Sequence, residues 1–108
     1  LTACSNNTRA VFAAGRSSSS QYTNIIDYVT IASTGNATDF GDLITSTREN
    51  GACSSPTRGV FGGGAADNTV MEYITLDSTG NATDFGNLGF GGGNTGVAGC
   101  SGVNGGIS

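Results

Sequence analysis

The side chains able to carry acid–base chemistry are few in this chain. Its 108 residues include eight Asp and Glu, four Arg and no His. Without His, the usual general base and the commonest metal ligand are missing, which excludes a Ser-His-Asp hydrolase. A glycosidase would need two facing carboxylates, and the spacing of the candidates selects no such pair, so we predict a non-enzymatic protein with no catalytic residue. The candidates are Asp27, Asp42, Glu49 and Glu72.

Three cysteines recur at intervals of about 50 residues, at Cys4, Cys53 and Cys100. An odd number cannot be fully paired within one chain. There is no CxxC pair and no His to complete a zinc site, so a small packing residue is favoured over a metal ligand. We predict three reduced, unpaired thiols, no metal site and no cofactor.

Oxygen-bearing side chains cluster in the segment DSTGNATD, where Asp77, Asn81 and Asp84 could bind calcium. The spacing does not match the D-x-[DN]-x-[DN]-G calcium loop. Asx turns, in which Asn or Asp bonds the backbone two residues on, account for these residues more simply. We therefore predict turns here and at the equivalent Asn36 and Asp39.

Charge excludes one class of partner. The formal net charge is −4 and only 11% of the residues are charged. Nucleic-acid binding needs clustered Lys and Arg, and the chain has no such cluster. No stretch approaches the roughly 20 apolar residues of a membrane span, so membrane insertion is not expected.

An internal repeat organises the chain. Cys4-Ser5 and Val11-Phe12 return 49 residues later as Cys53-Ser54 and Val60-Phe61. The nine residues STGNATDFG, at positions 33–41, return without a change at 78–86. The first copy has RSSSSQYTN where the second has AADN, a length change that a surface loop permits. We divide the chain into repeat 1 (1–47), repeat 2 (48–95) and the start of a third repeat (96–108).

Each repeat is expected to form four short strands. In repeat 2 we predict them at 51–54, 59–61, 69–76 and 82–88, with turns at SSPTR and DSTGN. The third is the clearest, because Glu72, Ile74 and Leu76 alternate with Met71 and Tyr73. Gly, Thr, Ser and Asn are poor helix formers, so the fold class is all-β.

Four strands in a repeat of about 50 residues are typical of a propeller blade, and the residues resemble the kelch repeat. Kelch blades carry an apolar second strand ending in a di-glycine, a Tyr in the third strand and an aromatic residue in the fourth. Val60-Phe61-Gly62-Gly63, Tyr73 and Phe85 match these positions in repeat 2. Repeat 1 departs at Ala13-Ala14, although Tyr28, Phe40 and Arg48 fit.

The kelch resemblance implies antiparallel propeller blades, two of them with the opening of a third; the alternative is a β-solenoid. Because propellers have roughly 4 to 8 blades, two cannot close a ring. Other copies of the chain, or further blades of a longer chain, are therefore expected partners.

The repetition is also similar to repeat-rich tail-fibre and adhesin proteins of tailed bacteriophages. This implies a structural or recognition module of the virion or an extracellular location, with a host-surface glycan or other virion proteins as partners. A carbohydrate-binding or carbohydrate-active propeller is the alternative. Binding is assigned to the loops that differ between the repeats, at Arg16, Ser18, Ser20, Tyr22, Asp67 and Asn68.

Overall fold

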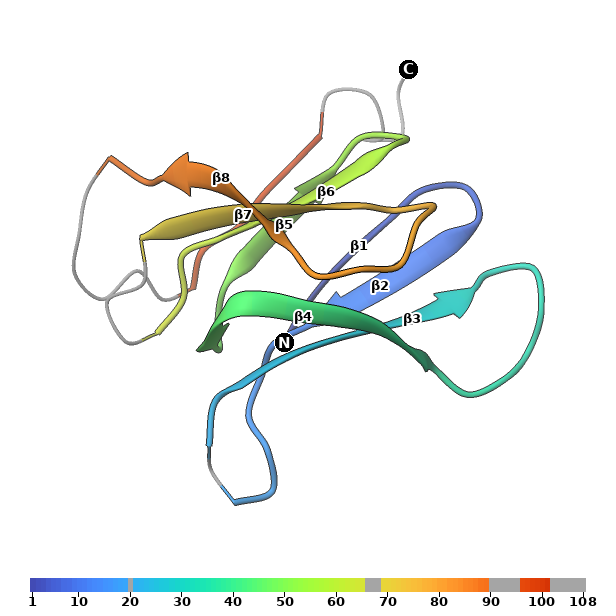
Figure 1. Cartoon of the computed structure of the whole chain (residues 1–108), viewed down its shortest axis with the longest axis horizontal. Coiled ribbons are helices and arrows are strands. Elements are labelled where there is room, and N and C mark those ends of the chain that lie inside the picture. Colours follow the sequence, from blue (N-terminus) through green and yellow to red (C-terminus); the bar gives the residue numbers. More distant parts are fainter. Residues whose placement is uncertain (20, 66–68, 90–95, 102–108) are drawn as a thin grey trace.

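The fold consists of two antiparallel β-sheets (Figure 1), seen in a computed structural model that describes residues 1–19, 21–65, 69–89 and 96–101. Each sheet has four strands, in the order β1-β2-β3-β4 for sheet 1 and β5-β6-β7-β8 for sheet 2. Every pair of neighbouring strands is antiparallel. The all-β prediction is confirmed. The strands are β1 (Thr2–Ser5), β2 (Arg9–Ala13), β3 (Thr23–Thr30), β4 (Thr38–Thr47), β5 (Gly51–Ser54), β6 (Arg58–Gly62), β7 (Val70–Thr75) and β8 (Thr83–Asn87).

The strands of sheet 2 lie where the sequence predicts them. β5 has the predicted bounds, β6 is one residue longer at each end, and β7 and β8 are each one residue shorter at both ends. Residues 96–101, at the start of the third repeat, form no strand within the described part of the chain. They lie against β5, where Val97 contacts Gly51 and Gly99 contacts Ala52.

The two sheets pack face to face, with β1 beside β5 (Figure 1). Alternation along β2, β6 and β7 sends every second side chain into the shared core. On β7 the buried residues are Glu72 and Ile74, and Leu76 follows them, which confirms the predicted alternation. The buried apolar residues of sheet 1 include Val11, Ala13, Ile26, Phe40 and Leu43, and those of sheet 2 include Phe61, Ile74 and Leu76.

Each repeat builds the same stack of one Arg and two aromatic rings. In sheet 1 the Arg9 guanidinium carbon lies 4.4 Å from the centre of the Tyr28 ring, and this ring meets Phe40 edge-on at 5.8 Å. In sheet 2 the corresponding distances are 4.3 Å, from Arg58 to Tyr73, and 6.1 Å, from Tyr73 to Phe85. Both arrangements have the geometry of favourable cation–π and aromatic pairs. Arg9 also donates to the Leu76 carbonyl of sheet 2 at 3.0 Å, so this stack links the two repeats.

The sheets are joined where the β7–β8 turn meets the edge of β4. The Gly80 N–H donates to the Phe40 carbonyl at 2.8 Å, and the Ala82 N–H donates to the Asp42 carbonyl at 2.9 Å. The Asp42 N–H in turn donates to Asn81 Oδ1 at 3.0 Å. We call this contact between residues 40–42 and 80–82 the turn–edge joint. It satisfies backbone groups at an edge that would otherwise invite pairing with another chain.

A β-bulge shapes the turn–edge joint. Ile26 pairs with Gly41 and Asp27 with Asp39, so Phe40 is the extra residue of β4. Gly41 has φ +152°, and a Cβ on it would collide with the Gly80 carbonyl. The same bulge recurs at Phe85 in β8, followed by Gly86 with φ +149°.

The prediction of local Asx turns is wrong for Asp77 and Asn81, whose side chains bridge the sheets instead. Asp77 Oδ1 accepts hydrogen bonds from Asn6 Nδ2 at 3.0 Å and from Thr8 Oγ1 at 3.3 Å. The Asx turn of the described residues that does form is at Asn6, whose Oδ1 accepts from the Thr8 N–H at 2.9 Å. Packing of the sheets brings hydrogen-bond donors of sheet 1 within reach of Asp77 and Asn81. A rule based on neighbouring residues in the sequence cannot predict these donors.

Gly41→Ala should destabilise the fold by about 1–3 kcal/mol more than Gly86→Ala, because only the first new methyl group collides with backbone. The two glycines have nearly the same φ, and a Cβ on Gly86 would meet only Met71 Cε at 3.8 Å. Backbone strain is therefore matched between the variants. Urea unfolding of both variants measures the difference, and equal losses of stability would contradict the joint described here.

Candidate functional site

Connections gather at two opposite ends of the sheets. The β1–β2, β3–β4, β5–β6 and β7–β8 turns share one end, toward the right of Figure 1, since antiparallel neighbours reverse there. We call this the turn end. The β2–β3 loop, the β4–β5 junction and residues 63–65 lie at the other end, which we call the loop end. The segment STGNATDFG, which is identical in the two repeats, lies at the turn end. The segment that differs in length between the repeats lies at the loop end.

The β2–β3 loop of the loop end is a small hairpin of its own. Arg16 and Tyr22 form an isolated antiparallel bridge. Inside it, the Ser17 N–H donates to the Gln21 carbonyl at 2.8 Å, and the Ser17 and Ser19 hydroxyls lie 3.0 Å apart. These local bonds hold a serine-rich tip out from sheet 1.

The structure places three of the predicted binding residues on this hairpin. Arg16 and Ser18 are exposed, and Tyr22 is 38% exposed. Arg16 and Tyr22 are brought together as strand partners. Ser20, Asp67 and Asn68 lie outside the described residues.

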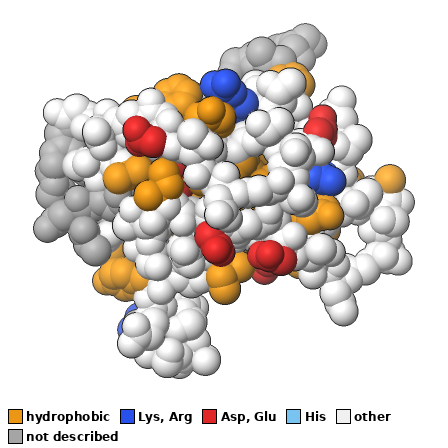
Figure 2. Space-filling view, viewed as in Figure 1, with side chains coloured by type: hydrophobic (Ala, Val, Ile, Leu, Met, Phe, Trp, Pro, Cys, Tyr) orange, Lys and Arg blue, Asp and Glu red, His pale blue; other side chains and the backbone are white. Residues whose placement is uncertain are grey.

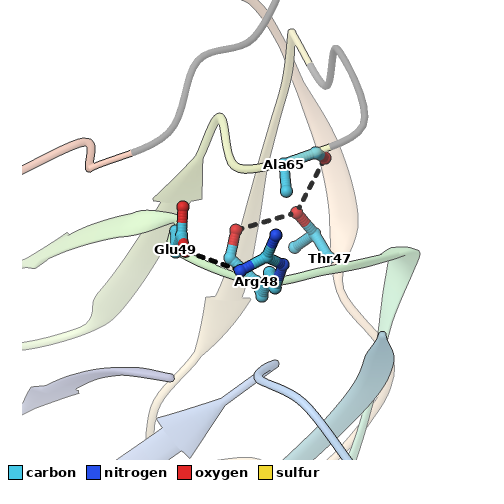
Figure 3. A network of polar contacts seen from close by, with 4 residues as sticks. All are labelled: Thr47, Arg48, Glu49 and Ala65. Atoms are coloured by element: carbon cyan, nitrogen blue, oxygen red, sulfur yellow. Dashed lines mark hydrogen bonds and ion pairs between the residues drawn. The ribbon is translucent and has the colours of Figure 1, made fainter. Parts of the chain in front are cut away.

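Arg48 ties the hairpin to the β4–β5 junction. Its guanidinium carbon lies 5.2 Å from the centre of the Tyr22 ring, and its Nη1 makes an ion pair with Glu49 Oε1 at 2.7 Å (Figure 3). Hydrogen bonding to Tyr22 and the charge of Glu49 raise the pKa of Arg48, so this group stays cationic. The loop end therefore presents a cation and an aromatic ring side by side.

The buried Thr47 precedes Arg48 and links the connections of the loop end. Its Oγ1 lies 3.4 Å from both the Arg48 and the Ala65 carbonyls (Figure 3). The Ala65 N–H donates to the Arg48 carbonyl at 2.8 Å, and the Gly15 N–H donates to the Thr47 carbonyl at 3.1 Å. The β2–β3 loop, the β4–β5 junction and residues 63–65 are thus joined by hydrogen bonds at Thr47 and Arg48. The tip of the hairpin is exposed.

Two equivalent cavities occupy the turn end, one in each repeat. Their volumes are about 200 Å³ beside the β7–β8 turn and about 170 Å³ beside the β3–β4 turn. Both are lined by hydroxyl and amide groups together with one tyrosine, Tyr73 or Tyr28. The remaining polar lining is Thr75, Ser78, Thr79, Asn81 and Thr83 in repeat 2, and Thr30, Ser33, Thr34, Asn36 and Thr38 in repeat 1.

The turn cavities are not among the binding residues that the sequence predicts. The signal was available, since the nine-residue identity of 33–41 and 78–86 covers most of their lining. From the sequence alone, that identity predicts only turns. A turn with this many hydroxyls also encloses space beside the preceding strand.

Two of the carboxylates considered for a glycosidase, Glu72 and Glu49, are bonded within the fold. Glu72 is 2% exposed and lies between the sheets, where its Oε1 accepts from the Ile44 N–H at 2.6 Å. Glu49 is engaged with Arg48. Within the described ranges no group of three His, Cys, Asp or Glu side chains converges on a position where a metal ion would fit.

Burial raises the pKa of Glu72, and the charge of Asp84 adds to the rise, while the hydrogen bond from Ile44 opposes it. The folded protein therefore holds the Glu72 proton more tightly than the unfolded chain does. Stability from this group is largest at low pH. It declines as pH rises from the ordinary value of 4.5 through the raised pKa.

The cysteines are free thiols in the structure, as predicted. Cys4 lies against Gly59 of sheet 2, where an added Cβ would come within 2.7 Å of its Sγ. Burial, with the neighbouring Cys53, raises the pKa of Cys4 to about 12. Cys100 is exposed. The three equivalent positions thus differ in environment.

Charged groups do not gather on the face of the molecule shown in Figure 2, where red and blue side chains stand apart on a mostly uncharged polar surface. No helix in the described ranges is long and apolar enough to cross a membrane. Neither a scan of protein-family models nor a search of curated proteins found a match to the chain.

Glu72→Gln should keep the hydrogen bond from Ile44, because an amide oxygen accepts as a carboxylate does, and should remove the charge. We expect the variant to be more stable than the wild type at pH 7, with the gap closing toward pH 4. Glu72→Ala should instead lose about 1–3 kcal/mol at low pH, since the Ile44 N–H is left without its acceptor. Urea unfolding of all three proteins across this pH range measures the effect, and parallel wild-type and Gln curves would contradict it.

Thiol labelling of the native protein at pH 8 should modify Cys100 first and Cys4 last. The Cys4 thiol is both desolvated and essentially protonated at this pH, whereas only the thiolate reacts. We expect the Cys4 rate to be at least about a hundredfold below that of Cys100. Mass spectrometry of labelled peptides assigns the sites, and denaturation should release three thiols per chain. Equal native rates would contradict the packing of β1 on sheet 2.

Proposed function

We propose that the chain is a non-enzymatic recognition module of stacked, kelch-like propeller blades, whose loop end binds the ligand. The observation that carries the proposal is the contrast between the two ends. The turn end repeats nine residues without a change, whereas at the loop end the offset between the repeats changes from 49 to 45 residues. A repeated framework with differing loops suits recognition, because loops accept substitution while a scaffold positions them.

Packing of two antiparallel four-stranded sheets on each other supports the propeller arrangement over a solenoid of parallel coils. β1 and β5, the first strands of the repeats, lie side by side, as inner strands of adjacent blades would. The Tyr and aromatic positions of the kelch pattern lie edge-on to each other in both repeats, as Tyr28 with Phe40 and Tyr73 with Phe85. Location in a phage tail or another extracellular fibre is part of the proposal and rests on the resemblance of the repeats.

The chemistry of the loop end favours a host-surface glycan as ligand. Tyr22 offers an aromatic face, Arg16 and Arg48 offer planar cations, and the serines offer hydroxyls. Aromatic rings stack on the apolar faces of sugars, and guanidinium groups bind carboxylates in pairs of hydrogen bonds. An acidic polysaccharide satisfies both kinds of group.

A second candidate is carbohydrate binding at the turn end. The observation that favours it is the pair of equivalent cavities, each lined by a tyrosine, hydroxyls and an asparagine. Their volumes are below the roughly 300–1,000 Å³ of drug-sized sites, so each would hold one sugar residue rather than a long chain.

Binding of the fluorescently labelled chain to an array of bacterial surface polysaccharides tests both candidates. Loop-end recognition predicts that Arg16→Ala with Tyr22→Ala weakens binding by at least about tenfold, as for other aromatic and Arg contacts. The matched control is Thr34→Ala with Thr79→Ala, which alters the turn cavities and should leave binding unchanged. The reverse pattern would support the turn end. Shortening of any bound polysaccharide on incubation would contradict a non-enzymatic role.

A further inference from the structure

Residues 97–99, at the start of the third repeat, lie on β5 as β5 lies on β1. Ser54 Oγ donates to the Ser5 carbonyl at 2.8 Å, and the Cβ position of Gly99 faces the Ala52 carbonyl. In each pair the two residues have the same position in their repeats, counted from the cysteine. The start of the third repeat therefore lies where the first strand of a third sheet would lie.

This third sheet has no second strand among the described residues. In sheet 2 the first strand, β5, pairs with β6 over residues 51–54 and 59–62. No strand of the described ranges pairs with residues 97–99. The position beside them that corresponds to β6 is therefore the one that an added strand would take.

A mainly apolar cavity of about 150 Å³ opens between residues 97–99 and the outward face of sheet 2, which is the face turned away from sheet 1. An apolar cavity of roughly this volume holds a benzene ring. The larger side chains in its lining are Cys53, Val60, Met71 and Leu88.

The equivalent wall in sheet 1 indicates what such a cavity accepts. The equivalent residues there are Cys4, Val11, Ile26 and Leu43. The last three form one buried cluster with Phe61 of sheet 2, and Cys4 packs against this cluster. Phe61 is 1% exposed and lies on β6, the second strand of its sheet. A Phe on the second strand of the next sheet is therefore the group that the cavity lacks.

The third repeat of this chain does not carry that Phe. Phe12 and Phe61 each follow the cysteine of their repeat by eight residues, and at this spacing after Cys100 the chain has Ser108. A serine is too small to fill the cavity, and its hydroxyl would need a hydrogen-bond partner among apolar walls. An aromatic ring in this place therefore comes from another polypeptide.

We infer that an extended segment of a partner protein adds beside residues 97–99, in the position of a second strand, and inserts a Phe side chain into the apolar cavity. In strand addition, backbone hydrogen bonds supply affinity and a pocket for one side chain supplies specificity. A small residue follows the Phe in the segment, as in Phe12-Ala13 and Phe61-Gly62. This inference goes beyond the proposed glycan recognition and does not depend on it.

A peptide with the sequence of residues 57–63 (TRGVFGG), capped at both ends and fluorescently labelled, serves as the probe. We expect the full chain to bind it with a dissociation constant between about 10 μM and 1 mM, measured by fluorescence anisotropy. The same peptide with Ala in place of Phe should bind at least about tenfold more weakly, because the cavity then stays empty. N-acetylphenylalanine amide, which has the ring without the strand, should also bind at least about tenfold more weakly than the peptide.

Two variants test the position of the bound peptide. Val60→Phe fills the cavity with a ring of the chain itself, so peptide binding should weaken by at least about tenfold. Val29→Phe is the matched control, because it adds the same ring at a half-buried valine of sheet 1 that does not line the cavity, and it should bind as the wild type does. Circular dichroism and urea unfolding establish that both variants are folded.

Thiol labelling gives a second measure of position, because Cys53 lines the cavity. With peptide at about four times its dissociation constant, alkylation of Cys53 should slow by about fivefold, since only the free protein reacts. The Ala peptide at the same concentration should leave the rate unchanged.

The inference is wrong if the wild type fails to bind the Phe peptide up to about 5 mM, or binds the Phe and Ala peptides equally. Unchanged binding by folded Val60→Phe, or unchanged labelling of Cys53 in the complex, would also overturn it. Binding of N-acetylphenylalanine amide as tight as that of the peptide would contradict strand addition. A chain that binds the peptide but no polysaccharide would count against the proposed function alone.

Discussion

The structure depends on one constraint, which is that a β-turn must lie directly on the edge of a neighbouring sheet. Gly41 has no side chain, and this lets the Gly80 and Ala82 amides reach the carbonyls of Phe40 and Asp42. The bulge at Phe40 turns its ring into the core while its carbonyl stays on the edge. Face-to-face packing, burial of Glu72 and bridging by Asp77 all require the sheets at this spacing. The repeated turn sequence is thus an interface as well as a turn.

The strands were predictable from the sequence, because the repeat fixes their number and alternation fixes their positions. Glu72, Ile74 and Leu76 were correctly placed on one face. The sequence did not indicate which face of each sheet would be covered, since both repeats carry apolar residues on both faces. Only the neighbour decides that Phe40 is buried and Phe85 exposed. The same reason explains the error at Asn81, whose acceptor is used by a residue 39 positions away in sequence.

The candidate site was predictable in part. Length variation pointed to the β2–β3 loop, and the structure pairs Arg16 with Tyr22 there. The contribution of Arg48 was missed, because it comes from the β4–β5 junction and meets Tyr22 only through the fold. Repeat 1 also keeps a positive φ at a position where the residue is no longer glycine. Ala14 has φ +63° where repeat 2 has Gly63 at +71°, so the shape is imposed by the surrounding strands.

Each strand of the described chain pairs only with strands adjacent to it in sequence, so both sheets are simple meanders. Contacts inside a meander close short loops, whose entropic cost is small, whereas the joint between residues 40–42 and 80–82 closes a loop of about 40 residues at a greater cost. Each sheet can therefore assemble during synthesis as soon as its own four strands have emerged. In this topology sheet 1 forms first. Its Phe40 face stays uncovered until the β7–β8 turn has been synthesised.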